Sequence, residues 1–158
     1  YVDFDTTRPV YKTRTDKCHV SHVVADTDSW EQKMAEALED MNEVVRYVKN
    51  HNLSFTIPYT LNGEEHQYHP DFVAVVKCGT GFQPVDHGQD ARATLNLLIE
   101  VTGEKKKDKA AKVSSARNLW VPAINNHGGY GRWAFLEIAD PWDAQNLIRA
   151  KLRSPTLA

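Results

Sequence analysis

The chain has 158 residues, and 19 Lys and Arg against 21 Asp and Glu give a formal charge of −2 with histidine neutral. This length suits one domain with a sizeable core, and 41% hydrophobic with 25% charged residues is typical of a globular chain. The composition excludes a disordered chain, and the apolar runs are too short to span a membrane.

The cysteine content and the first residue indicate where such a chain belongs. Cys18 and Cys78 are too few for a disulfide framework, and no secretion signal opens the sequence. We therefore expect a reducing, cytoplasmic compartment and no membrane partner. Because the sequence begins at Tyr1 and not at methionine, we also expect a domain of a longer polypeptide.

The first half of the chain is predicted to contain a helix and a hairpin. Residues 1–28 are expected to form an irregular, β-prone lead-in. Apolar residues then recur every three or four positions from Trp30 to Val48, which predicts a single long helix. Two strand-like runs follow at 54–60 and 65–77, and the Asn62-Gly63 pair between them is a strong hairpin signal.

The second half is predicted to alternate strand and helix. After a polar connection, Leu95 to Thr102 is expected to be a buried strand and Glu104 to Trp120 a helix that Pro122 ends. A strand from Trp133 to Ala139 leads to a last helix, which begins at Asp140-Pro141. The predicted order after residue 28 is α-β-β-β-α-β-α, which is an α/β fold.

Two carboxylates interrupt these apolar strands. Asp71 follows Pro70 in one predicted strand, and Glu100 lies in the middle of the next. Because side chains alternate along a strand, Glu100 and Thr102 should point to one face and Ile99 to the other. Carboxylates are rarely buried unless they are paired or bound to a metal. Two of them on neighbouring strands predict a site for a hard cation such as Mg²⁺, while a salt-bridge role stays open for each one alone.

A third acid and a lysine cluster accompany this pair. On the predicted first helix, Glu31 lies at the border of the apolar stripe, from which a side chain can face the sheet. Beyond Glu100, Lys105, Lys106 and Lys107 fall in the first turn of a predicted helix, where the helix dipole disfavours cations. A phosphate contact beside a metal site would explain that cluster.

These residues resemble the PD-(D/E)xK nuclease superfamily, in which a Pro-Asp in one strand precedes an acidic-x-Lys in the next and a helix glutamate lies upstream. The corresponding residues here are Pro70-Asp71, Glu100-Val101-Thr102 and Glu31. The segments WEQKMAEALE, YHPDFVAVV, LIEVTGEKKKDK and GGYGRWAFLEI are more closely similar to the C-terminal nuclease region of the Res subunits of type III restriction enzymes and related helicase–nucleases.

The resemblance covers about residues 29–145 and implies a fold. The implied fold is a restriction-endonuclease-like αβββαβ core, with a central mixed sheet flanked by helices. The nuclease domain would occupy 29–153, and residues 1–28 would lead in from an upstream helicase part.

The resemblance also implies a metal-dependent DNA endonuclease. Asp71 and Glu100 would hold Mg²⁺ or Mn²⁺ with the carbonyl of Val101, and Glu31 would hold a second ion or orient water. The lysine position of the family holds Thr102 in this chain, and Lys106 is the expected catalytic substitute.

The same resemblance implies partners. Double-stranded DNA, the upstream helicase/ATPase region of the same polypeptide and a modification (methyltransferase) subunit are expected. Residues expected to contact the DNA backbone are Lys105, Lys107, Lys109 and Arg117. His69 would contact water or phosphate, or be a structural histidine.

Two alternatives to a nuclease stay open. The threonine at the lysine position and the near-neutral charge also fit a catalytically inactive DNA-binding or docking module attached to a helicase. A purely structural cap on the helicase is the other alternative, and it would bind no metal.

Overall fold

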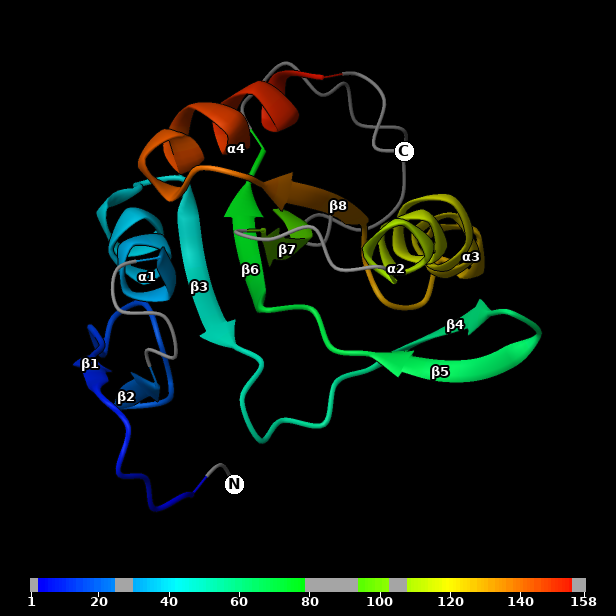
Figure 1. Cartoon of the computed structure of the whole chain (residues 1–158). Coiled ribbons are helices and arrows are strands. Elements are labelled where there is room, and N and C mark those ends of the chain that lie inside the picture. Colours follow the sequence, from blue (N-terminus) through cyan, green and yellow to red (C-terminus); the bar gives the residue numbers. More distant parts are fainter. Residues whose placement is uncertain (1–2, 25–29, 79–93, 103–107, 155–158) are drawn as a thin grey trace.

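A four-stranded mixed sheet lies at the centre of the computed structural model, which describes residues 3–24, 30–78, 94–102 and 108–154 (Figure 1). Its strands, in spatial order, are β3 (Val44–Lys49), β6 (Phe72–Lys77), β7 (Thr94–Val101) and β8 (Trp133–Ile138). The first three are antiparallel to their neighbours, and β8 runs parallel to β7. The predicted central mixed sheet is therefore confirmed.

Helices cover both faces of this sheet, as predicted. Two apolar clusters divide the core between the faces. The first cluster joins the sheet to α1 (Trp30–Asp40) and α4 (Ala144–Arg153), and a short 3₁₀ turn, η2 (Pro141–Asp143), leads into α4. The second includes residues of a π-helical turn, η1 (Ala116–Trp120), which joins α2 (Lys109–Ser115) to α3 (Val121–His127).

Two small antiparallel sheets flank this body. At the N-terminal side β1 (Val10–Lys12) pairs with β2 (His22–Val24). Between β3 and β6 the chain forms a hairpin of β4 (Ile57–Leu61) and β5 (Glu64–Tyr68), which extends past α2 and α3 in Figure 1. The hairpin turns at Asn62-Gly63, where both residues have positive φ, as the sequence predicts.

The long helix predicted from Trp30 to Val48 is wrong in its second half. The helix ends at Asp40, and Val44–Lys49 forms the edge strand β3. Apolar spacing alone could not separate the two states, because the buried positions of this short strand continue the spacing of the helix. The β-branched valines and a tyrosine in this run favour a strand.

Two further boundaries differ from prediction. The run predicted as one strand over 65–77 is divided, because the chain leaves the hairpin at His69-Pro70 and enters the central sheet at Phe72. The helix expected to stop at Pro122 continues to His127. Pro122 falls in the first turn of α3, directly after the π-helical turn η1, where a missing N–H costs little.

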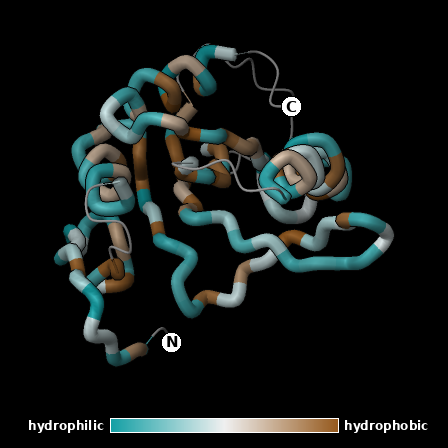
Figure 2. Tube along the Cα trace, viewed as in Figure 1, coloured by the Kyte–Doolittle hydropathy of each residue, from teal (hydrophilic) through white to brown (hydrophobic). Residues whose placement is uncertain are grey.

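The described part of the predicted lead-in packs against the domain. Cys18, Val23 and Val24 are buried, and the first two belong to the same apolar cluster as α1. Figure 2 shows hydrophobic residues along the central strands, whereas most of β5 is hydrophilic. Among the described residues, no helix combines the length and apolar character needed to cross a membrane.

Candidate functional site

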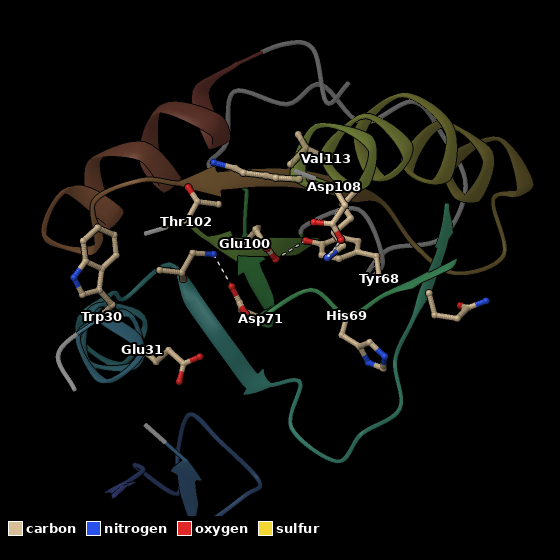
Figure 3. A pocket seen from close by; sticks show the side chains of 13 residues that line it. Trp30, Glu31, Tyr68, His69, Asp71, Glu100, Thr102, Asp108 and Val113 are labelled. Atoms are coloured by element: carbon tan, nitrogen blue, oxygen red, sulfur yellow. Dashed lines mark hydrogen bonds and ion pairs between the residues drawn. The ribbon is translucent and has the colours of Figure 1, made fainter. Parts of the chain in front are cut away.

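A cleft of about 590 Å³ opens at the ends of β5, β7, α1 and α2 (Figure 3). Charged and polar side chains dominate its described lining. The carboxylates are Glu31, Asp71, Glu100 and Asp108, and the lysines are Lys109 and Lys112. The cleft also contains Trp30, Gln67, Tyr68, His69, Val101, Thr102 and Val113.

Asp71 and Glu100 meet because of the pairing between β6 and β7. The last registered pair is Phe72 with Ile99, so Asp71 and Glu100 occupy the next opposite positions. The Val101 N–H donates to Asp71 Oδ2 at 2.7 Å, which fixes the aspartate against β7. Ile99 is fully buried in the core, whereas Glu100 lines the cleft, so the predicted alternation of faces is confirmed.

Tyr68 holds the second carboxylate. Its hydroxyl donates to Glu100 Oε2 at 2.6 Å, and its side chain is buried at the end of β5. Burial, together with the charge of Glu100, raises the pKa of Tyr68 far above its ordinary value of 10.0. The phenol therefore stays protonated, and it is a permanent donor to this carboxylate.

Glu31 faces the same cleft but is bound by a lysine. Lys49, the last residue of β3, places Nζ 2.5 Å from Glu31 Oε2 and donates to the Val24 carbonyl at 2.5 Å. Only 6% of the Lys49 side chain is exposed. The sequence could not show this pair, because the predicted helix ran through the segment that forms β3.

Thr102 and Lys109 share one acceptor. Thr102 Oγ1 donates to Glu137 Oε1 at 3.3 Å, and Lys109 Nζ lies 2.6 Å from the same oxygen. The hydrogen bond from Lys109 lowers the pKa of Glu137 below its ordinary value of 4.5. An ammonium group thus lies beside the threonine that occupies the lysine position of the resemblance.

Lys112 and Asp108 form a second pair on α2. Their Nζ and Oδ2 atoms lie 2.7 Å apart, and the Tyr59 hydroxyl donates to the same oxygen at 3.1 Å. The hydrogen bond from Lys112 lowers the pKa of Asp108. This i,i+4 spacing was visible in the sequence. The described cleft residues that the site prediction missed are Trp30, Gln67, Tyr68, Asp108, Lys112 and Val113.

The structure brings most of the predicted site residues together. Those that line the cleft are Glu31, His69, Asp71, Glu100, Val101, Thr102 and Lys109. Arg117 lies elsewhere, since its guanidinium packs 5.6 Å from the centre of the Phe135 ring. The predictions for Lys105, Lys106 and Lys107 fall outside the described residues.

The carboxylate pair has the chemistry of a magnesium site. The described residues contain no group of three or more His, Cys, Asp or Glu side chains that could hold a metal ion. Mg²⁺ often uses one or two protein carboxylates and takes its other oxygens from water and substrate phosphates. Asp71 and Glu100 therefore fit such an ion by donor type and number.

Comparison of the chain with protein-family models, with curated proteins and with solved structures gives no match.

Proposed function

We propose that this chain is a metal-dependent endonuclease domain that hydrolyses phosphodiester bonds in double-stranded DNA. The opposite placement of Asp71 and Glu100 carries the proposal. Like charges directly opposite on two strands are destabilising. A divalent cation coordinated by both carboxylates would offset that repulsion, and carboxylate oxygens are the donors that Mg²⁺ prefers.

The order of the elements supports the same proposal. Without the inserted β4–β5 hairpin, the chain runs α1, β3, β6, β7, α2 and β8. This order agrees with the αβββαβ order that the family resemblance implies for a restriction-endonuclease-like fold, and this agreement supports the proposal. On that basis the proposed partners are DNA, an upstream helicase/ATPase region and a modification subunit, as in type III restriction enzymes.

The residues of the cleft have separable roles in this proposal. Asp71 and Glu100 would hold Mg²⁺ or Mn²⁺, which when bound polarises a phosphoryl oxygen and lowers the pKa of a bound water. The Val101 N–H and the Tyr68 hydroxyl keep the two carboxylates oriented. Lys109 and Lys112, each beside the carboxylate that it pairs with, would contact the phosphates of the DNA.

A second candidate function is DNA binding or docking without cleavage. Thr102 favours it, because a hydroxyl that donates to Glu137 supplies no positive charge to a phosphate. In this alternative Lys109 and Lys112 would still attract DNA, but the cleft would lack the lysine that family members carry beside the second acid.

Calorimetric titration with Mg²⁺ and Mn²⁺ tests the proposal. We expect the wild type to bind, and Asp71→Asn and Glu100→Gln each to weaken binding at least tenfold. Glu64→Gln is the matched control, since this glutamate is 82% exposed on the hairpin and the charge change is the same. Failure of folded wild-type protein to bind metal, even with a DNA duplex present, would leave the docking module or the structural cap.

A plasmid-nicking assay then separates the two candidates. Metal-dependent nicking by the wild type, lost in Glu100→Gln, supports the endonuclease. Metal and DNA binding without nicking supports the module that lacks cleavage.

A further inference from the structure

A pair of tryptophans lies at the cleft, and one of them is largely exposed. Trp142 on η2 is 59% exposed, and its indole packs edge-to-face on Trp30 with 6.2 Å between the ring centres. We propose that this pair is a stacking platform for an unpaired base of the DNA in the cleft. The inference rests on the proposed function and deepens it, because it names the class of DNA substrate: a single strand, or a duplex with an unpaired base.

Trp30 connects the exposed indole to the cleft. It is the first residue of α1, and it lines the cleft together with Asp71 and Glu100. Figure 3 shows Trp30 on the α1 side of the cleft, away from Tyr68. Because Trp142 packs on Trp30 and is the more exposed of the two, aromatic surface continues from the cleft to the outside of the molecule. A strand that leaves the cleft on this side would place its bases against the two indoles.

The turn that carries Trp142 is well fixed. Asp140 Oδ1 accepts a hydrogen bond from the Trp142 N–H at 2.9 Å, and the buried Pro141 begins the turn. An aromatic side chain on a fixed turn loses little conformational entropy when a ligand stacks on it. Trp142 is therefore already ordered for a stacking contact.

The surroundings of Trp142 favour a base over a phosphate group. Asp140 and Asp143 flank the indole, and carboxylates repel the phosphate backbone. The lysines of the described cleft lining, Lys109 and Lys112, lie on α2 instead. Phosphates beside α2 and a base on the tryptophans would satisfy both regions.

The structure of duplex DNA decides which base can stack there. Within a duplex both faces of a base are covered by its neighbours, so an indole reaches a base face only at an end, at an unpaired base or by unstacking the helix. Aromatic side chains that bind single strands stack on successive bases with little sequence preference. An unpaired base is therefore the ligand that this platform fits.

Fluorescence anisotropy with labelled DNA tests the inference without a cleavage assay. The probes are a single strand of mixed sequence, the same strand annealed to its complement, and a strand of the same length with abasic sites in place of its bases. Ca²⁺ is present as the divalent ion, since it takes the same oxygen ligands as Mg²⁺.

Trp142→Leu is the decisive variant, because it keeps an apolar contact with Trp30 and removes the aromatic face. We expect it to bind the single strand at least about fivefold more weakly than the wild type, and the duplex within about twofold. The abasic strand should bind wild type and variant equally. Trp142→Phe, which keeps a ring, should recover most of the lost affinity.

Leu119→Ala is the matched control. Leu119 is 69% exposed on η1 and is not among the described residues that line the cleft, so its loss should change the affinity for each probe less than about twofold. Equal losses for the single strand and the abasic strand in Trp142→Leu would indicate a backbone contact and overturn the stacking platform.

The remaining outcomes separate this inference from the proposed function. Unchanged affinity of Trp142→Leu for the single strand would overturn the platform and leave the metal-dependent nuclease standing, with Trp142 then free to contact a protein partner. Failure of folded wild-type protein to bind any of the probes would overturn both.

Discussion

Two carboxylate clusters of this protein are built in opposite ways. In the Glu39 cluster, one glutamate of α1 accepts hydrogen bonds from the Tyr11 hydroxyl, the Tyr47 hydroxyl and the Arg14 N–H, each at 2.8 Å. Glu39 is 3% exposed. In the cleft, by contrast, Asp71 and Glu100 face each other at the end of two strands.

The difference teaches how to separate a structural acid from a binding acid. Around Glu39 the donors converge on one carboxylate, so burial is compensated and the cluster ties β1–β2 to α1 and β3. In the cleft two carboxylates occupy opposite positions of neighbouring strands, and each accepts a hydrogen bond that fixes its orientation. The first arrangement stabilises the fold, whereas the second is suited to binding a cation.

The largest effect on stability is expected from a substitution that removes the acceptor of the Glu39 cluster. Glu39→Ala would leave two phenol groups and one backbone N–H without their acceptor, which should lower the free energy of unfolding by about 3–5 kcal/mol. Chemical denaturation measures it. Glu36→Ala, on the same helix but about a third exposed, should cost less than about 0.5 kcal/mol. Equal losses in both variants would show that the Glu39 cluster is not special.

The second prediction concerns Tyr68, the cleft residue most like the tyrosines around Glu39. Tyr68→Phe removes the donor to Glu100 and should cost about 1–2 kcal/mol of stability. Because Tyr68 orients a proposed ligand, its loss should also weaken Mn²⁺ binding about tenfold. Tyr47→Phe is the control, since it should reduce stability to a similar extent and leave Mn²⁺ binding unchanged. A loss of Mn²⁺ affinity in both variants would contradict the assignment of Tyr68 to the binding site and of Tyr47 to the fold alone.

The carboxylate pair itself should respond far less than Glu39. Asp71→Asn or Glu100→Gln removes one of two like charges at opposite strand positions, and the amide keeps an oxygen that accepts a hydrogen bond, so stability should change by less than about 1 kcal/mol. Thermal unfolding in a metal-free buffer measures this change. Added Mn²⁺ should stabilise the wild type more than either variant. Destabilisation of more than about 2 kcal/mol in both variants would instead indicate a structural pair.

The smallest expected effect concerns Glu43, which belongs to neither cluster. Arg149 Nε lies 2.7 Å from its carboxylate, and this hydrogen bond lowers the pKa of Glu43 below its ordinary value of 4.5. A lowered pKa in the folded state means that the stabilisation is present above about pH 4.5 and disappears as the pH falls through the lowered value.

The side chains of Glu43 and Arg149 are each about one-third exposed, so the pair should contribute only about 0.5 kcal/mol to the free energy of unfolding. Denaturation curves of wild type and Glu43→Gln between neutral and acidic pH measure it. The two should converge as the pH falls, and a constant difference would contradict the assignment.

Local sequence patterns were enough to predict the position of Glu100 and of the hairpin. Alternation along LLIEVT placed Glu100 on the cleft side, and the Asn62-Gly63 turn placed the hairpin. The Glu31–Lys49 pair could not be predicted in the same way. It joins a helix start to the end of a strand 18 residues later, and that strand continued the apolar spacing of the helix.

The Glu39 cluster was hidden for a similar reason. Two of its three donors, Tyr11 and Arg14, come from a segment with weak periodicity, and only tertiary packing brings them to α1. The angular position of Glu31 on the helix correctly predicted that its side chain faces the cleft. It could not predict the ion pair with Lys49.

The register between β6 and β7 has a consequence for how freely this chain can be altered. Phe72, Ala74 and Val76 pair with Ile99, Leu97 and Leu95, and all six side chains are fully buried. A slip of one position would turn these residues out of the core. The pairing of the two acids is therefore set by hydrophobic side chains and not by the residues that connect the strands. A polar or small residue at one of these six apolar positions would therefore endanger the carboxylate site as well as the core, even though it touches neither acid.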